Sequence, residues 1–324
     1  MMKVCSLLPS ATEILFALGC GDQVVGVTDR CDYPPEAATK PVVSRTLVDI
    51  YTPTGAEVDE MMQEYARSGK STYALDLDRL RRAQPGVIIT QDLCSVCAVD
   101  SNQLYEAIAG LQPTPKVLVL SPRNLSEIFA DILAVGEATN STIQAQELVE
   151  RLRDRVKTVT SKTVRATRRP RCLFLVWTDP PIAVGGWIAE MVNLAGGSQG
   201  FVESHEAYAR VTWSQVLDYR PEFIFISPGG FDIQKTTEEV RWLAMKEGFW
   251  ELPAVQAGHV YVIDSGYYAR AGPRVVTGLE TLAQILHPEL FSGLIPQGAV
   301  VRFDPSAQGH RVAERLVESF GQYP

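Results

Sequence analysis

Two cysteines three positions apart, Cys94 and Cys97, form the most chemically suggestive pair in the sequence. This spacing brings two thiols to one turn of chain, where they can carry out redox chemistry or bind a soft metal. The pair follows an expected strand at 86–90, at the edge where α/β folds bind ligands. A structural zinc needs two more ligands, and only Cys31 also lies just past an expected strand of the same half. Three interpretations therefore stay open: an inert pair, a ligand or metal contact with Cys31, Cys94 and Cys97, and a redox pair.

Outside this pair the sequence lacks the common catalytic signatures. It has no Gly-x-Ser-x-Gly, no Walker loop, no Gly-x-Gly-x-x-Gly after a strand and no His-Glu-x-x-His. Of the four histidines, His259 and His287 stand before a strand and before a proline, as turn residues do. We expect a binding protein that is not an enzyme and needs no cofactor. An enzyme acting through the Cys pair is the alternative.

Aromatic residues gather in expected loops. Trp177 opens a segment that continues to Pro180-Pro181, and Trp187 follows Gly185-Gly186. Aromatic side chains dominate protein cores, but those at strand ends beside Pro or Gly are better placed to wall a cleft. Such a composition favours a large flat ligand. The loop aromatics are Tyr33, Tyr73, Trp177, Trp187, Trp213, Phe231, Tyr267 and Tyr268.

Short apolar strands alternate with amphipathic helices along the chain. The strand 3–8 leads into Ser10-Ala11-Thr12-Glu13, where Ser10 can cap a helix and Glu13 can close a capping box. The alternation restarts after the basic stretch 165–171, with strands at 172–176 and 223–226. This order predicts parallel sheets in an α/β fold.

Two motifs recur in the same order in both halves of the chain. Residues 13–19 match 190–196, with Glu and Gly six apart in each, and residues 83–90 match 219–226. Between the halves, 126–161 lacks proline and keeps apolar residues at helical spacing, which predicts one long helix or a broken pair.

We therefore expect two related lobes, with a ligand cleft between them and an insertion of about 40 residues around 45–76 in the first. The expected boundaries are 1–122 for the first lobe, 123–164 for a bridging helix, 165–290 for the second lobe and 291–324 for a C-terminal extension without a functional interpretation.

Composition excludes several classes of protein. The 324 residues are 46% hydrophobic and 21% charged, with a net charge of −8 that opposes nucleic-acid binding. No apolar run approaches the roughly 20 residues that cross a bilayer. The apolar run Val4–Leu8 is too short for a signal peptide, and six cysteines are no disulfide framework for this length. We expect a cytoplasmic protein with reduced thiols; the alternative is a periplasmic or cell-envelope protein with a truncated N-terminus.

Four segments together resemble the cobalamin-binding proteins of ABC importers. They are Leu8-Pro9-Ser10-Ala11-Thr12-Glu13, Cys31-Asp32-Tyr33-Pro34-Pro35, the segment 91–99 with its two cysteines, and Arg270-Ala271-Gly272-Pro273-Arg274. These proteins belong to the helical-backbone receptors that also carry iron-siderophores and haem. The resemblance covers about residues 2–288. It implies two Rossmann-like α/β lobes joined by a long bridging helix, as in class III periplasmic binding proteins. We also expect a monomer.

The resemblance also implies a cobalamin or corrinoid ligand held between the lobes. In the family a Tyr of the Asp-Tyr-Pro turn and residues before the Arg-Ala-Ser/Gly-Pro-Arg motif line the pocket. Another family aromatic falls at Gln91, so the pocket wall differs there. With the loop aromatics Trp177 and Trp187, the expected ligand-binding residues are Tyr33, Tyr73, Gln91, Asp92, Trp177, Trp187, Tyr267, Tyr268 and Arg270. The alternative ligand is a metal or ferric chelate bound around Cys31, Cys94 and Cys97.

Importer-coupled members of this family present one acidic residue on each lobe to arginines of the permease. The first position matches Asp78. The second falls near Ser214, which is not acidic, and Asp218 or Glu222 could substitute for it. An ABC permease is therefore an expected partner, with Asp78 as its docking residue.

Overall fold

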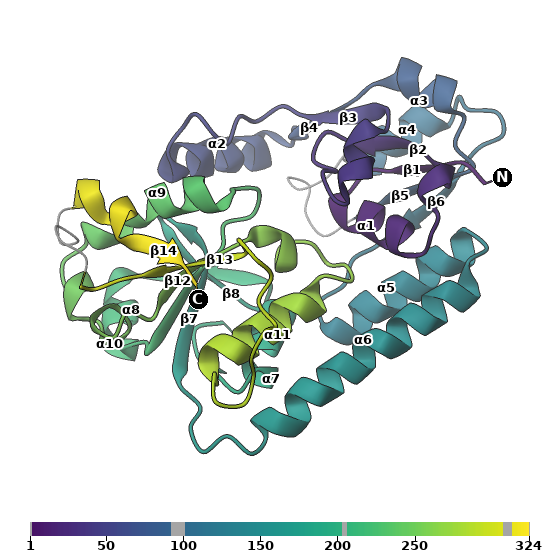
Figure 1. Cartoon of the computed structure of the whole chain (residues 1–324). Coiled ribbons are helices and arrows are strands. Elements are labelled where there is room, and N and C mark those ends of the chain that lie inside the picture. Colours follow the sequence, from purple (N-terminus) through teal and green to yellow (C-terminus); the bar gives the residue numbers. More distant parts are fainter. Residues whose placement is uncertain (1, 92–100, 203–205, 307–312, 324) are drawn as a thin grey trace. The chain divides into compact units, whose positions relative to one another are not determined.

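The structure is a computed structural model that describes residues 2–91, 101–202, 206–306 and 313–323 (Figure 1). The chain divides into two compact units. The first comprises Met1–Asp49, Val58–Arg153 and Ala271–Pro273. The second comprises Ile50–Glu57, Asp154–Arg270 and Arg274–Pro324. Each unit contains one mixed sheet, which confirms the predicted α/β class.

The sheet of the first unit has the strand order β4-β3-β2-β1-β5-β6. All neighbours pair in parallel except β4, which is antiparallel to β3. A parallel sheet needs crossover helices, and the alternation in the sequence supplies them. The strands are β1 (Val4–Ser6), β2 (Val24–Thr28), β3 (Val42–Thr46), β4 (Tyr73–Leu75), β5 (Val87–Thr90) and β6 (Lys116–Val119).

Helices α1 (Pro9–Ala17), α3 (Leu77–Ala83) and α4 (Ser101–Ile108) connect these strands. The predicted capping box at the start of α1 is wrong. The helix begins at Pro9, whose preset φ suits the first position, and its N-cap residue is Leu8, which has no side-chain acceptor. Ser10 therefore lies inside the helix.

The proline-free stretch after β6 forms two helices, α5 (Leu125–Ala138) and α6 (Thr142–Thr163). The chain breaks at Thr139–Ser141, where Ser141 N donates to Gly136 O. A Cβ on Gly136 would lie 2.4 Å from Cβ of Ala145, so glycine lets the start of α6 pack closely on α5. The division between the two units falls within α6, after Arg153.

The second unit has an eight-stranded sheet of order β10-β8-β7-β11-β12-β13-β14, with β9 beside β7. Its parallel core is β7, β11 and β12. The strands are β7 (Arg171–Thr178), β8 (Pro181–Val184), β9 (Ser198–Gln199), β10 (Tyr208–Arg210), β11 (Phe223–Ile226), β12 (Val260–Ile263), β13 (Val300–Phe303) and β14 (Phe320–Gln322). The helices are α7 (Gly186–Leu194), α8 (Trp213–Tyr219), α9 (Ile233–Ala244), α10 (Pro253–Gln256) and α11 (Val275–Leu286).

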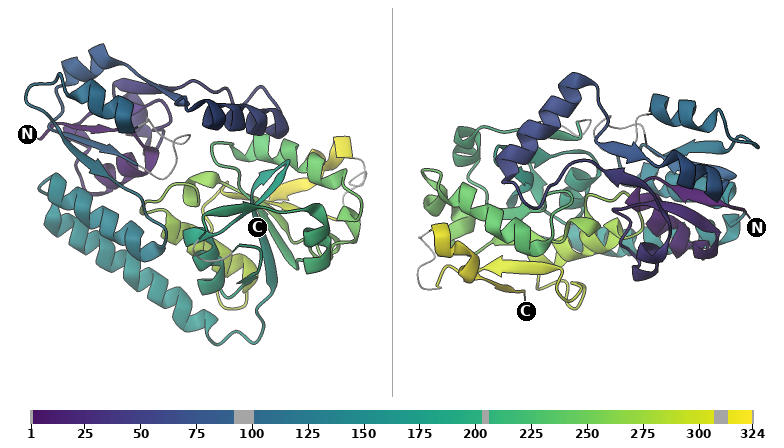
Figure 2. Two further views of the ribbon diagram at one scale, coloured as in Figure 1. Left: turned by 180° about the vertical axis from the view of Figure 1, so that it is seen from behind. Right: turned by 90° about the horizontal axis from the view of Figure 1, so that it is seen from above.

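The last residues are part of the second unit's core rather than a loose tail. Strands β13 and β14, yellow in Figure 2, continue the sheet beyond β12 in antiparallel pairing. Val301, Phe303 and Leu316 are buried in the same hydrophobic cluster as the strands β7, β11 and β12. The C-terminal residues therefore stabilise this sheet by covering its edge.

The two sequence repeats have matching local structure. Gln84 ends α3 and Arg220 ends α8, both in the left-handed region, with φ of 46° and 51°. A proline follows each of them and then a parallel strand begins. Gly19 and Gly196 follow α1 and α7, and both also have positive φ. These repeated helix ends indicate that the two units are structurally related.

Candidate functional site

Ligands of α/β folds bind at the carboxyl ends of the parallel strands, and we call this edge of each sheet its functional edge. In the first unit, Tyr33 follows β2 with 44% of its surface exposed, and Gln91 follows β5 and is half-buried. Tyr73 opens β4 beside Thr46, the last residue of β3, and its ring is half-buried against the core. The structure thus brings Tyr33, Tyr73 and Gln91 to this edge. Asp92 lies outside the described residues.

Cys31, from the proposed metal set, is buried at the same edge. Its Sγ is 3.0 Å from Oγ1 of Thr12, which in turn donates to Ser6 Oγ at 2.8 Å. This is a short buried chain of hydrogen bonds between a thiol and hydroxyl groups. Cys94 and Cys97 lie outside the described residues, and within the described ones no three His, Cys, Asp or Glu side chains are placed to hold a metal ion.

Asp78, the expected docking residue, lies in the first turn of α3. Its side chain is 77% exposed and forms an ion pair of 3.2 Å with Arg81 one turn later. Such a surface pair contributes little to stability. The carboxylate therefore remains accessible to a partner.

In the second unit, Trp177 lies near the carboxyl end of β7. Its ring centroid is 5.0 Å from that of Phe231, in the loop after β11. Ser265, after β12, donates its Oγ hydrogen to Phe231 O at 3.2 Å. The carboxyl end of β7 and the loops after β11 and β12 therefore meet at Phe231. This places Trp177 on the second unit's functional edge.

The remaining predicted residues lie in or beside the segment that follows β12. Tyr267 is half-buried, with the Arg274 guanidinium 5.1 Å from its ring centroid, and Arg270 is half-buried. Trp187, at the start of α7, donates its Nε1 hydrogen to the backbone oxygen of Tyr268 at 2.8 Å. The structure therefore brings Trp187, Tyr267 and Arg270 to one segment.

Tyr268 does not line a surface, contrary to the sequence prediction. Only 1% of it is exposed, its ring lies 5.2 Å from Phe174, and its hydroxyl donates to Gly278 O at 3.0 Å. Burial raises its pKa well above the usual value. The adjacent positions 267 and 268 are equally aromatic in sequence, so the pattern could not separate a ring at the surface from one in the core.

Sequence reasoning also missed residues 50–57, which fold with the second unit. Thr54 and Glu57 form a capping box at the start of α2 (Gly55–Ser68): Glu57 Oε2 accepts from Thr54 N at 2.8 Å, and Glu57 N donates to Thr54 Oγ1 at 3.4 Å. The Thr-x-x-Glu spacing is the signal that could have marked this helix start. The backbone oxygen of Gly55 accepts the Nε1 hydrogen of Trp177 at 3.0 Å.

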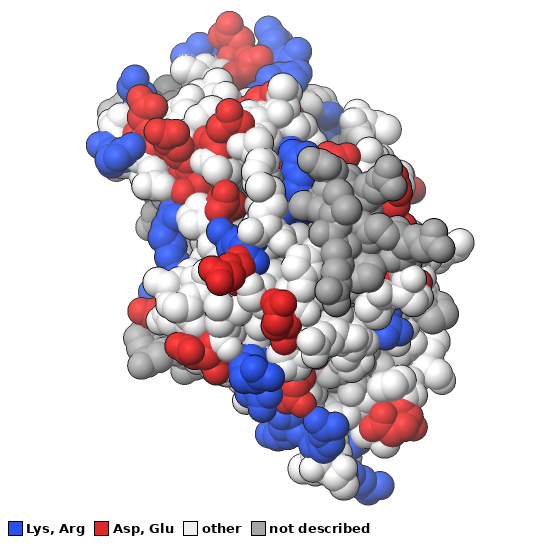
Figure 3. Space-filling model, turned by 90° about the vertical axis from the view of Figure 1, so that its left-hand side faces the viewer, with Lys and Arg blue, Asp and Glu red and all other residues white. Residues whose placement is uncertain are grey.

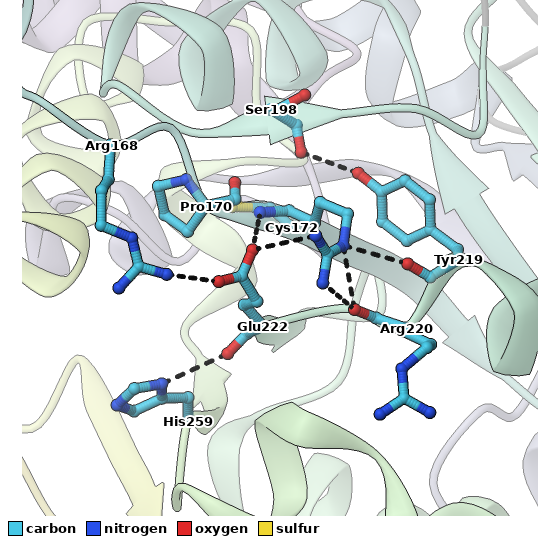
Figure 4. A network of polar contacts seen from close by, with 9 residues as sticks. Arg168, Pro170, Cys172, Ser198, Tyr219, Arg220, Glu222 and His259 are labelled. Atoms are coloured by element: carbon cyan, nitrogen blue, oxygen red, sulfur yellow. Dashed lines mark hydrogen bonds and ion pairs between the residues drawn. The ribbon is translucent and has the colours of Figure 1, made fainter.

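A separate pocket of about 400 Å³ lies at the opposite, amino-terminal edge of the second sheet. Glu222, just before β11, accepts hydrogen bonds from Arg168 at 2.7 Å and from the amide of Arg171 at 3.1 Å (Figure 4). His259 Nδ1 is 3.2 Å from Glu222 O, and its ring stacks on Phe223 at 4.3 Å. These polar groups satisfy one another, and ligands of α/β folds bind at the other edge. We assign this network to the structure of the sheet.

Charge is mixed over the surface drawn in Figure 3, where Lys and Arg side chains lie among Asp and Glu. A nucleic-acid interface needs a basic patch instead. In the part of the chain that the structure describes, no helix combines the length and apolar character of a membrane span.

The sequence matches a family model and several named relatives. The model of the periplasmic binding protein family matches residues 4–267. An uncharacterized ABC transporter substrate-binding lipoprotein of Bacillus subtilis is 27% identical over 297 residues, covering 89% of this chain and 81% of its own. A vitamin B12-binding protein of Vibrio parahaemolyticus is 24% identical over 279 residues, covering 86% of each chain.

Solved structures share the fold. The periplasmic vitamin B12 binding protein of Vibrio cholerae has a TM-score of 0.64 at 22% identity, covering 88% of this chain and 96% of its own. The periplasmic heme-binding protein of Roseiflexus sp. RS-1 has a TM-score of 0.67 at 21% identity, covering 90% and 99%. Proteins named for different ligands are therefore equally similar in fold.

The comparisons overturn the cytoplasmic expectation, because the relatives are named as lipoproteins or periplasmic proteins. Reduced thiols do not indicate a cytoplasmic protein here, for a physical reason. Cys5, Cys20, Cys31 and Cys172 are all buried, and burial raises the pKa of Cys5 and Cys172 to about 12. The thiolate is the reactive form. Buried thiols of this kind therefore give no evidence for a reducing compartment.

Proposed function

This chain belongs to the periplasmic binding protein family, and we propose that it binds cobalamin or a related corrinoid for an ABC importer. The family consists of substrate-binding proteins of transporters, which are not enzymes. Relatives named vitamin B12-binding proteins match most of the chain. The ligand is held by burial and hydrogen bonds, and no catalytic group is required.

The observation that carries this proposal is the set of aromatic side chains at the carboxyl edges of the sheets. The first unit presents Tyr33 and Tyr73 there, and the second presents Trp177 and Tyr267. A corrin ring is large and flat, with a rim of amide groups. Aromatic faces bind such a ring by apolar contact, while a group such as Arg270 can bind the polar rim.

Haem is the second candidate ligand. Its iron can take a tyrosine oxygen as axial ligand. Tyr33 offers this group, since it is 44% exposed on the first unit's functional edge. Haem and cobalamin both have large flat rings, but only haem binding depends on the phenol oxygen. Replacing the tyrosine by phenylalanine therefore separates the two candidates.

Calorimetric titration with cyanocobalamin, with hemin and with divalent metal ions tests the proposal on protein pretreated with a chelator. We expect saturable one-to-one cyanocobalamin binding and no thiol-dependent metal signal. Tyr33→Phe should keep cobalamin affinity, whereas Tyr33→Ala should weaken it about tenfold through the lost ring contact. Tight binding of hemin alone, lost in Tyr33→Phe, would replace cobalamin by haem. A metal signal abolished by alkylation would favour the ligand set of Cys31, Cys94 and Cys97.

A further inference from the structure

Residues 50–57 are folded as part of the second unit, although the chain before and after them belongs to the first. Tyr51 donates its Oη hydrogen to Gly230 O at 3.0 Å. A Cβ on Gly230 would lie 2.8 Å from Cδ1 of Ile50, and Gly230 has a φ of +89°. Glycine is therefore required where the loop after β11 passes beside Ile50.

A buried ion pair on α9 holds this segment by its backbone. Glu239 is 0% exposed, and its Oε2 accepts a hydrogen bond from Gly55 N at 3.0 Å. Lys235 Nζ lies 3.1 Å from Glu239 Oε1 and donates to Pro53 O at 3.0 Å. A buried ion pair is costly to desolvate and is weak evidence of net stabilisation by itself. Here both charged groups bind backbone atoms of residues 50–57. The role of the ion pair is therefore to fix the position of this segment.

Close packing around Gly55 fixes the position of the segment further. A Cβ on Gly55 would lie 2.9 Å from Oε2 of Glu239 and 3.6 Å from Nε1 of Trp177. Gly55 also begins α2, and a carboxylate at a helix N-terminus is favourable. The Thr54–Glu57 capping box holds the same turn, and hydrogen bonds from Thr54 lower the pKa of Glu57.

The segment contacts the functional edge of the second unit. Trp177, which binds Gly55 O, lies near the end of β7, and Gly230, which binds Tyr51, lies in the loop after β11. Tyr51 as a whole nevertheless remains 48% exposed. An aromatic ring held by its hydroxyl at a functional edge is an available contact surface for a flat ligand.

We propose that Ile50–Thr54 form part of the ligand-binding edge of the second unit, where the ring of Tyr51 contacts the bound corrinoid. Lys235 and Glu239 are the positioning residues that hold the segment there. The identity of the ligand rests on the proposed function. This gives part of the expected insertion at 45–76 a role in ligand binding.

The contact is tested by calorimetric titration of Tyr51→Ala, Tyr51→Phe and the control Tyr208→Ala with cyanocobalamin. Tyr208 is 61% exposed on β10, opposite Val184. We expect about tenfold weaker binding for Tyr51→Ala, a smaller loss for Tyr51→Phe, which keeps the ring, and no change for Tyr208→Ala. Wild-type affinity in Tyr51→Ala would overturn the contact, provided that the wild-type chain binds.

The anchor is tested by hydrogen exchange of the residue-55 amide in the unliganded protein. Glu239→Ala should accelerate this exchange at least tenfold, whereas Glu239→Gln keeps an acceptor and should retain most of the protection. Gly55→Ala provides a second disruption that keeps both charged residues, because its Cβ would lie 2.9 Å from Glu239 Oε2 and must displace one of the two groups. All three variants are checked for cooperative thermal unfolding.

The affinities of these anchor variants for cyanocobalamin complete the test. We expect Glu239→Ala and Gly55→Ala to bind severalfold more weakly and Glu239→Gln to bind nearly as the wild type does. Unchanged exchange in Glu239→Ala would overturn the anchor, and faster exchange without loss of affinity would overturn its role in binding. A wild-type chain that binds no cyanocobalamin would instead overturn the proposed function, while the exchange experiment would still decide the anchor.

Discussion

The imidazole of His259 stacks on Phe223 with 4.3 Å between ring centroids and 11° between ring planes. His259 stands just before β12 and Phe223 begins the neighbouring β11, so the pair joins two parallel strands at their amino ends. Burial lowers the pKa of His259, with a smaller contribution from Arg302 on β13. A neutral imidazole is therefore part of this packing.

This pKa shift predicts a stability that falls in mild acid. The unfolded chain takes up a proton on His259 at its ordinary pKa near 6.5, while the folded chain resists it. The neutral imidazole therefore contributes its full stabilisation above about pH 6.5. This stabilisation is lost as the pH falls through the lower pKa that His259 has in the folded chain. Urea unfolding from pH 7.5 to 5 should show a shallower pH slope for His259→Asn than for the wild type. Equal slopes would contradict the prediction.

Asp131 on α5 predicts a stabilising substitution. Burial, with a contribution from Glu127 one turn earlier, raises its pKa to about 7. The folded chain therefore loses stability as the pH rises from about 4 to about 7, and the loss is complete above that. The full shift corresponds to about 4 kcal/mol, which solvent screening of this half-buried side chain reduces to about 1–2 kcal/mol.

Asp131→Asn should accordingly be more stable than the wild type by about 1–2 kcal/mol at pH 8 and by much less at pH 4. Chemical unfolding at both pH values measures this difference. Asp154→Asn, at an exposed position of α6, is the matched control and should change little at either pH. A gain of equal size at pH 4 would point to a cause other than ionisation.

Features set by neighbouring residues could be predicted from the sequence, whereas those set by contacts between residues far apart in the chain could not. The helix ends at Gln84 and Arg220 could be anticipated, because each stands before a proline and a short apolar strand. The burial of Tyr268 could not, because it depends on Phe174, far away in the sequence. Likewise the segment around Gly55 is fixed by residues more than a hundred positions away.

A side chain at Gly136 would overpack the contact between α5 and α6. Its missing side chain allows Ala145 to approach to 2.4 Å from where a Cβ would lie, and the backbone oxygen of Ser141 to 3.1 Å. Gly136→Ala must therefore separate the two helices, at a cost of about 1–3 kcal/mol in the free energy of unfolding. In an open helix position the same change would stabilise, by about 1 kcal/mol. Thermal unfolding thus distinguishes the two situations by sign.

Arg155 and Glu280 form a partly buried ion pair between α6 and α11. Arg155 Nε donates to Glu280 Oε1 at 2.9 Å and Nη2 to Oε2 at 2.6 Å, while Nη2 also donates to Thr277 Oγ1 at 2.8 Å. Two parallel hydrogen bonds to one carboxylate require the planar guanidinium. Arg155→Ala should lower the free energy of unfolding by about 1–2 kcal/mol, and Arg155→Lys should restore less than half of this loss.

A double-mutant cycle with Glu280→Gln separates this interaction from the loss of the arginine stem. The coupling free energy should be about 1 kcal/mol and should shrink only partly in 1 M salt, because Glu280 is 13% exposed. Zero coupling would mean that packing of the Arg155 stem, rather than the ion pair, joins the two helices. In that case Arg155→Met would be as stable as the wild type, whereas the geometry of the pair requires it to be weaker.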